Sequence, residues 1–223
     1  MSTLLKDLNE MRRLQREIAT KVILEDRFNK EITSIAGIDI AFLGDLAIVA
    51  CITVSYNSLE TTFKTLSTSS ISFPYIPTLL SFREAPPIID LINSIESKPD
   101  VFLINAHGIA HPFFCGCASY VGVMANIPTI GVASRNLCGE YDGEPKDVGA
   151  HIQLSYSGRS IGWIFKSRRG CRPIFISPGH LISLKSSLDI VIKCTKNHKL
   201  PEPLYFAHSV ANKEKRKRVS KYC

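Results

Sequence analysis

The order of the apolar segments constrains the fold of this chain more than any other feature. Segments 32–42 and 46–54 have the composition of two β-strands, and Gly44 and Asp45 between them are typical of a hairpin turn. A third antiparallel strand is expected over residues 61–66. Beyond it, short apolar runs alternate with segments of helical periodicity. This order predicts an α/β fold, in which helices cover both faces of one mixed β-sheet.

The remaining elements are predicted from their periodicity and from the residues at their ends. The short buried strands expected after the hairpin cover residues 101–104, 129–133, 161–165 and 173–176. The expected helices lie between Leu4 and Val22, from Pro86 to Ile95, over 118–125, from Ser177 to Val191 and from near Pro203 through His208. The first helix is amphipathic and is expected to cover the sheet. Proline marks several of these helix starts, because it is favoured in the first turn.

The size of the chain is that of one domain. Its 223 residues, of which 45% are hydrophobic, are enough to bury a full core. We expect a single domain over residues 1–212, a basic tail over 213–223, and a monomer. The longest apolar runs fall short of the ~20 residues that a transmembrane helix needs, so no membrane association is expected.

The charge of the chain is concentrated near its C-terminus. The formal net charge is +7 and the pI is about 9.1. Because lysine and arginine release counterions when they bind phosphates, this cluster favours a nucleic-acid partner. The alternative is a solvated tail that aids solubility or targeting. The clustered residues are Lys213, Lys215, Arg216, Lys217, Arg218 and Lys221.

The cysteines indicate a reducing compartment. There are seven, an odd number, and residues 1–13 lack the apolar core of a signal peptide, so we expect a cytoplasmic protein. Cys115 and Cys117 lie near His107 and His111, which raises the question of a zinc site. The two cysteines are separated by one residue and no second pair follows at a typical interval, which favours small buried hydrophobes.

Asp39 is a carboxylate in the middle of a predicted strand. The alternation of residues 36–42 places it between Gly37 and Ala41, on the face opposite to the large apolar side chains. The small neighbours leave room beside the carboxylate. A buried carboxylate is unfavourable unless it is paired or holds a cation, so Asp39 is a candidate metal ligand, with a structural salt bridge as the alternative.

Asn105 follows the buried run 101–104 and precedes a histidine-rich turn at 106–112. Ligand-binding groups collect where the strands of such sheets end. An aspartate at this position would complete an acidic triad with Asp39 and Glu84, suited to Mg²⁺ or Mn²⁺. The asparagine does not change the predicted fold, but it leaves open whether this position takes part in metal binding and catalysis.

Tyr75 lies in a turn stiffened by Pro74 and Pro77. Such a turn can hold an aromatic ring out of the surface, where it could stack on nucleobases or wedge between them. A packing anchor is the alternative for Tyr75. Glu84, just ahead of Pro86, could bind a metal or interact favourably with a helix dipole.

Several groups of residues, in order from the first strand to the last helix, resemble the endonuclease V family. Their order makes the resemblance specific, although each motif alone would be weak. The groups are Ala-Gly-Ile-Asp at 36–39, residues 74–77 with Phe-Arg-Glu at 82–84, 107–112 with 116–119, 130–133 with 137–139, 177–184, and 200–203 with 207–208.

This resemblance implies a ribonuclease H-like endonuclease that recognises inosine in DNA or RNA and serves nucleic-acid repair or processing. It would cut the second phosphodiester bond 3′ to the inosine. Catalysis would depend on Asp39, Glu84 and His208, with Mg²⁺ (or Mn²⁺) held by Asp39, Glu84 and the residue at position 105. Tyr75 matches the wedge that separates the strands. The expected substrate-binding residues are Tyr75, Pro74, Ile76, Arg83, His107, Gly108 and Gly116.

The departures from the family pattern lie close to the expected chemistry. Besides Asn105, the family's arginine after His-Pro is Phe113, a histidine is Tyr120 and a lysine is Ser134. Arg135 is adjacent to Ser134, but a continuing strand would turn it to the opposite side. Each departure removes a group that would handle phosphate or metal.

Two hypotheses follow for the function. One is a divergent nuclease that hydrolyses phosphodiesters with metal assistance, in which Asn105 offers an oxygen without charge. The other is a protein that binds inosine or nucleic acid and has lost cleavage. Asp39, Glu84, His208 and Tyr75 favour the enzyme, whereas the missing arginine and lysine favour the binding protein.

Overall fold

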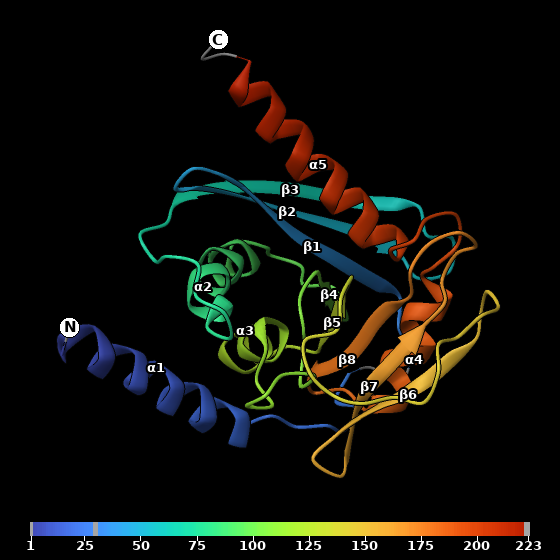
Figure 1. The fold of residues 1–223 in the computed structure, drawn as a ribbon. Helices are drawn as coiled ribbons and strands as arrows, with labels where there is room; N and C mark the ends of the chain where they lie inside the picture. Colours follow the sequence, from blue (N-terminus) through green and yellow to red (C-terminus); the bar gives the residue numbers. More distant parts are fainter. Residues whose placement is uncertain (1, 29–30, 221–223) are drawn as a thin grey trace.

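One mixed sheet runs through the protein (Figure 1). The computed structural model describes residues 2–28 and 31–220, and in them eight strands pair in the order β3-β2-β1-β4-β5-β8-β7-β6. The first three strands form an antiparallel meander, β4 and β5 run parallel to β1, and the last three strands return antiparallel. The strands are β1 (Ser34–Leu43), β2 (Leu46–Ser55), β3 (Thr61–Ser70), β4 (Val101–Ile104), β5 (Thr129–Ala133), β6 (His151–Tyr156), β7 (Arg159–Phe165) and β8 (Ile174–His180).

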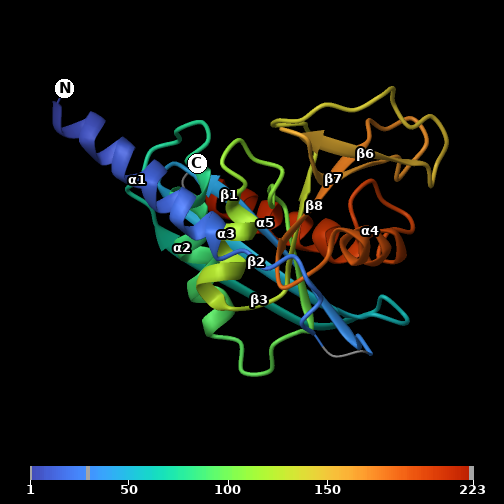
Figure 2. The same ribbon diagram turned by 90° about the horizontal axis from the view of Figure 1, so that it is seen from below.

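Helices cover both faces of this sheet, as the sequence predicts (Figure 2). Two apolar cores result, one on each face: α4 and α5 bury one, and α2 and α3 bury the other. α1 packs against α3. It therefore covers a helix, and the expectation that it covers the sheet is wrong. The helices are α1 (Ser2–Thr20), α2 (Leu80–Asn93), α3 (Cys117–Ala125), α4 (Leu184–Lys193) and α5 (Glu202–Val219).

The first helix after the meander begins earlier than the sequence suggests. α2 starts at Leu80, so Pro86 and Pro87 lie inside it and the expectation that proline opens this helix is wrong. Proline removes a backbone donor, but Ile88 and Leu91 on the same helix are fully buried against the sheet. That packing outweighs the lost hydrogen bonds. Glu84 is consequently a residue of the helix and not of the segment before it.

The helix expected from Ser177 is also wrong at its start. Ser177 and Pro178 belong to β8, and α4 begins at Leu184. Its N-cap is Ser183, whose Oγ accepts a hydrogen bond from the backbone N–H of Ser186 at 3.1 Å. The polar strand β6 was not expected either, because only Leu154 in it is fully buried.

Gly37 lets α5 lie directly on β1. A side-chain carbon at this position would come within 2.2 Å of the Pro203 backbone, so only glycine fits there. The close approach brings the following turns of α5 over the middle of β1. No helix in the described residues is long and apolar enough to cross a membrane.

Candidate metal and nucleic-acid site

Asp39 and Asn105 meet because their strands run in parallel. Ile38 pairs with Ile104 in the β1–β4 register, and the Asn105 backbone N–H donates to Ile38 O at 3.1 Å. The next side chains along both strands are therefore neighbours. Asn105 Nδ2 donates to Asp39 Oδ1 at 2.8 Å. The residue in place of a third carboxylate thus hydrogen-bonds directly to the first.

The second oxygen of Asp39 contacts α5. His208 Nδ1 lies 2.7 Å from Asp39 Oδ2. The side chain of Asp39 is only 6% exposed and that of His208 is 52% exposed, so the pair joins the interior to the surface. The hydrogen bond to Asp39 raises the pKa of His208, although partial burial opposes this effect. His208 therefore holds its proton more firmly than a free histidine.

Glu84 is the second buried carboxylate of the site. Burial, and next the negative charge of Asp39, raise the pKa of Glu84 to about 7, while Arg83 lowers it. Two anionic groups that disfavour each other in a buried place become favourable when a cation lies between them. Within the described part of the chain, no three His, Cys, Asp or Glu side chains converge as metal ligands. Of the three residues that the sequence predicts as metal ligands, two are carboxylates and Asn105 is neutral.

A pocket of about 280 Å³ opens beside this site. It contains Tyr75, His107 and Gly116 from the expected substrate-binding set, together with Ala106, the neighbour of Asn105. Three buried polar atoms of its lining have no hydrogen-bond partner among the described residues: Gln15 Oε1, Ser81 Oγ and His107 Nδ1. Unpaired buried polar atoms are unfavourable, so such a lining suits a ligand that carries hydrogen-bonding groups.

Sequence reasoning missed Gln15 as part of this pocket. Its Nε2 donates to Thr78 O at 3.1 Å and to Cys115 O at 2.7 Å. Gln15 thereby connects the loop after Tyr75 to the segment before α3, and these form two walls of the pocket. The available signal was its polar side chain on the otherwise apolar stripe of the first helix.

Arg135 was expected to face away from the site only if the strand continued, and the strand ends before it. β5 ends at Ala133, so strand alternation no longer applies at Arg135, which lines the pocket with Asn136 and Leu137. Arg135 is also exposed to solvent. A basic group therefore remains close to the position where Ser134 replaces a lysine of the family pattern.

Tyr75 is exposed as its flanking prolines predict. The residue is 69% exposed, which is more than any other large apolar or aromatic residue in the described residues. The guanidinium of Arg83, a residue expected to bind substrate, donates to Phe73 O and lies 4.4 Å from the centre of the Phe42 ring. Arg83 thus fixes the start of the loop that carries Pro74, Tyr75 and Ile76.

Gly108 and Gly116 shape the loop on which His107 lies. A side-chain carbon on Gly108 would come within 2.1 Å of Pro178 O, and one on Gly116 within 2.3 Å of His107 O. The Gly108 N–H donates to Ser177 Oγ at 2.8 Å, and the Gly116 N–H donates to Gly108 O at 2.9 Å. Both amides are therefore used inside the protein. Gly116 lines the pocket and Gly108 does not.

The histidines and cysteines of this loop are uncharged at neutral pH. Burial lowers the pKa of His107 and of His111 to about 4. Burial also raises the pKa of Cys115 to about 12 and that of Cys117 well above its usual value. Both cysteines are buried and unpaired, which agrees with their interpretation as small buried hydrophobes.

Two other departures from the family pattern make contacts of their own. Arg16 lies over the ring of Phe113, with its guanidinium carbon 4.8 Å from the ring centre. A positive charge is thus held next to the position where the pattern has an arginine. The Tyr120 ring meets the Phe82 ring edge-on at 5.5 Å, so Tyr120 serves as packing between α2 and α3.

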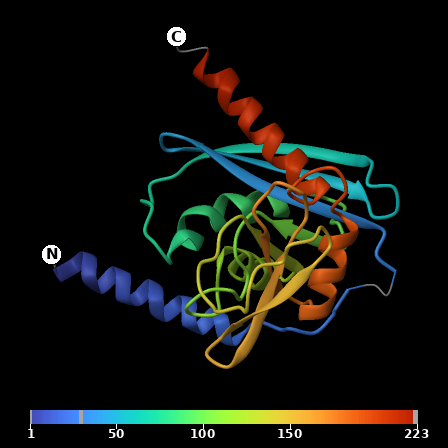
Figure 3. The same ribbon diagram turned by 45° about the vertical axis from the view of Figure 1, so that its right-hand side comes forward.

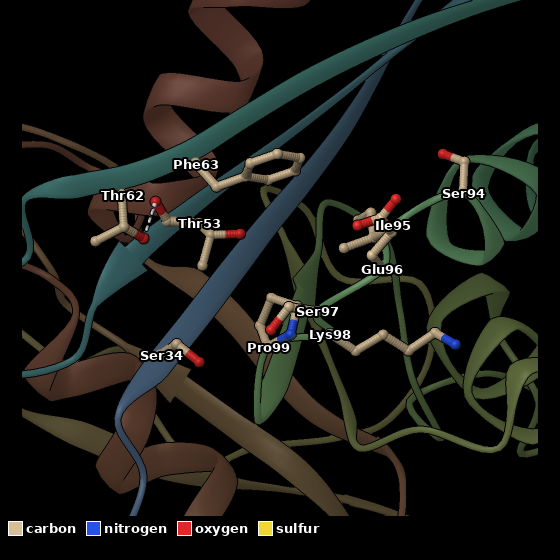
Figure 4. Close-up of a pocket in the computed structure, with 10 residues that line it drawn as sticks. All are labelled: Ser34, Thr53, Thr62, Phe63, Ser94, Ile95, Glu96, Ser97, Lys98 and Pro99. Carbon is tan, nitrogen blue, oxygen red and sulfur yellow. Dashed lines mark hydrogen bonds between the residues drawn. The ribbon is translucent and has the colours of Figure 1, made fainter.

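A larger cavity of about 490 Å³ lies elsewhere, under the start of β3 (Figure 4). Its walls are Thr53, Thr62 and Phe63 on one side and the segment 94–99 after α2 on the other. Thr62 Oγ1 donates to Thr53 O at 3.3 Å. The site residues expected from the sequence do not line this cavity; several of them lie around Asp39 and the pocket of Tyr75.

The chain is similar to solved structures of several organisms. An endonuclease V of Streptomyces avermitilis is 27% identical, with a TM-score of 0.86 over 95% of this chain and 94% of that chain. One of Bacillus subtilis is 28% identical, with a TM-score of 0.86 over 95% and 92%. One of Ciona intestinalis, in complex with a 24mer DNA containing an inosine followed by a ribo-adenosine, is 26% identical, with a TM-score of 0.83 over 95% and 99%. The family model of endonuclease V matches residues 16–209, and the chain therefore belongs to the endonuclease V family.

Proposed function

We propose that this protein is a metal-dependent endonuclease that cuts nucleic acid at inosine. The observation that carries the proposal is the pair of buried carboxylates, Asp39 and Glu84, beside a pocket that has unpaired polar atoms and an exposed tyrosine. The chain would act on DNA or RNA and cleave the second phosphodiester bond 3′ to the inosine. We place it in the cytoplasm, as a monomer, in nucleic-acid repair or processing; the six unpaired cysteines of the described residues agree with a reducing compartment.

The residues around Asp39 fit a hard cation. Asp39, Glu84 and Asn105 carry oxygen atoms, which Mg²⁺ and Mn²⁺ prefer, and burial together with the charge of Asp39 raises the pKa of Glu84, so a nearby cation would favour its ionised form. These three residues would hold Mg²⁺, with Mn²⁺ as the alternative ion. When bound, the cation lowers the pKa of a water ligand and neutralises charge on the phosphate. Asn105 would have to present Oδ1 in place of the N–H group that now contacts Asp39.

His208 has two tasks in this proposal. Its Nδ1 donates to Asp39 Oδ2 and orients the carboxylate. The hydrogen bond to Asp39 raises its pKa and so favours the protonated form of this half-exposed imidazole. A phosphate placed there would receive a hydrogen bond from the other ring nitrogen.

The pocket beside Tyr75 would receive the inosine base. Hypoxanthine carries hydrogen-bond donors and acceptors, which complement Gln15 Oε1, Ser81 Oγ and His107 Nδ1. Pro74, Tyr75 and Ile76 would wedge into the strand as the base leaves it. Arg83 would act by holding this loop, and Gly108 and Gly116 by shaping the wall that carries His107.

Replacing Tyr75 with alanine is expected to weaken binding to an inosine duplex while leaving thermal stability almost unchanged. The ring is 69% exposed, so little packing is lost, whereas stacking of a base on an aromatic ring contributes about 1–3 kcal/mol. Phe63→Ala is the matched control, because Phe63 is 46% exposed and lines the cavity under β3 instead. Affinity and melting temperature would be measured for both variants. A large loss of stability with unchanged affinity would make Tyr75 a packing residue.

One observation favours a second function, selective binding of inosine without cleavage. The N–H group of Asn105 donates to Asp39 Oδ1, so this carboxylate is satisfied without a cation. A site held together in this way could keep the fold and the base pocket while its affinity for metal is low.

Cleavage of end-labelled strands tests the proposal and separates the two functions. Strands with one inosine and matched strands with adenosine would be incubated with Mg²⁺, with Mn²⁺ and with chelator. We expect one metal-dependent product, cut at the second phosphodiester bond 3′ to inosine, in DNA or RNA. Selective binding of the inosine strand without any product would favour the second function. Equal handling of inosine and adenosine strands would contradict both.

A further inference from the structure

The face of α5 that carries His208 continues outward as a basic surface. At 3.6 residues per turn, Asn212 and Lys215 lie on the same face as His208, and Arg216 lies beside them. An open hollow of about 450 Å³ follows this face from the catalytic histidine toward the C-terminus. The hollow is lined by Tyr205, His208, Ser209, Asn212, Lys215 and Arg216.

The positive charges on this face are not neutralised by the protein. Arg216 Nε donates to the helix carbonyl of Asn212 at 3.3 Å, and in the described ranges neither Lys215 nor Arg216 forms an ion pair. Arg218, on another side of the helix, is paired with Glu214 at 2.9 Å. The uncompensated charge therefore faces the hollow that begins at His208.

The second half of α5 contributes little to the core. Leu204, Ala207 and Ala211 are fully buried and hold the first half of the helix on the sheet. Beyond them the helix projects past the strands, as Figures 1 and 3 show. The last turns remain accessible to a large partner, and packing does not account for their basic residues.

We infer that His208, Asn212, Lys215 and Arg216 form a track for the phosphate backbone of the bound nucleic acid. The inference rests on the proposed function, because His208 joins the track to Asp39. At a rise of 1.5 Å per residue, Arg216 lies about 12 Å along the axis from His208. This span corresponds to roughly three to four nucleotides at 3.4 Å each. The track contacts phosphates next to the cleavage position and reads no base.

The test compares two faces of the same helix. The variant Lys215→Gln with Arg216→Gln removes two charges from the track, and the control Lys213→Gln with Lys217→Gln removes two exposed charges from the opposite side. Binding to a duplex without inosine would be measured over a range of salt concentrations. We expect the slope of log affinity against log salt to fall by roughly 2 in the track variant and much less in the control.

A charge-preserving variant separates charge from damage to the helix. Lys215→Arg with Arg216→Lys keeps both charges and is expected to bind like wild type. Equal losses in the track variant and its control would overturn the inference, because the helix would then act only through diffuse charge. An unchanged slope in the track variant would also overturn it.

The proposed function fails by a different result. The ratio of affinities for inosine and adenosine duplexes in the wild-type protein depends on the base pocket and not on the track. A ratio of one, with the slope difference intact, would contradict inosine recognition and leave the track in place. A high ratio without a slope difference would support inosine recognition and contradict the track.

Discussion

Replacing Asp39 with asparagine is expected to abolish divalent-metal binding and cleavage together. The substitution keeps the shape of the side chain but removes the carboxylate that lies between Asn105 and His208. Glu84 would remain as the single carboxylate of the site. We expect cleavage to fall at least roughly a thousandfold, which corresponds to about 4 kcal/mol of transition-state stabilisation. Metal titration and single-turnover cleavage of an inosine strand would be measured.

The same variant has a readout that does not depend on activity. The hydrogen bond to Asp39 is the main cause of the raised pKa of His208, so Asp39→Asn should lower that pKa toward its usual value. Nuclear magnetic resonance of the imidazole protons can follow this change. Asp189→Asn is the matched control, because Asp189 is a half-exposed carboxylate paired with Lys185 on α4. If Asp39→Asn bound metal and cleaved as the wild type does, the metal site would have to lie elsewhere.

The residue pattern predicted the fully buried central strands well, because burial dominates their composition, whereas it missed the polar strand β6. The ranges expected at 101–104 and 129–133 coincide with β4 and β5, in which every residue is buried. Proline gave wrong predictions of helix starts where tertiary packing determined the structure. Pro86 lies inside α2 because the helix buries a large apolar face, and Pro178 lies inside β8, where its carbonyl accepts the N–H of Ile109 at 2.9 Å.

The centre of the site was predictable because strand order brings its residues together. Parallel pairing of β1 with β4 follows from the α/β pattern and makes Asp39 and Asn105 neighbours. The residues that line the pocket were harder to predict from the sequence. Gln15 and Arg135 reach it from a helix and a loop that are far apart in sequence, and strand alternation does not apply to Arg135 because β5 ends at Ala133.

Replacing Asn105 with aspartate is expected to tighten divalent-metal binding by roughly tenfold or more. At about 4 Å, one additional charge contributes on the order of 4 kcal/mol at an effective dielectric constant of 20, so a tenfold gain is a low estimate. Cleavage should rise, or appear where the wild type has none. Without metal the variant should be less stable, because the hydrogen bond from Asn105 to Asp39 is replaced by repulsion between carboxylates.

The gain in activity should remain incomplete. Phe113, Tyr120 and Ser134 still lack the polar groups of the family pattern, and effects within one catalytic unit do not add independently. Asn93→Asp is the matched control, because it adds the same charge at the exposed end of α2. The control should change neither metal affinity nor cleavage. If both substitutions had equal effects, the effect at position 105 would be explained by the change in net charge alone.

Calorimetric titration with Mn²⁺ at several pH values tests most directly whether Asp39, Glu84 and position 105 form one cation site. Below pH 7 Glu84 holds a proton that an incoming cation must displace, because its pKa is raised to about 7. We therefore predict a single bound ion whose affinity for the wild type increases as the pH rises through 7, and a tighter single ion in Asn105→Asp. Affinity that is independent of pH and unchanged by Asn105→Asp would contradict the site.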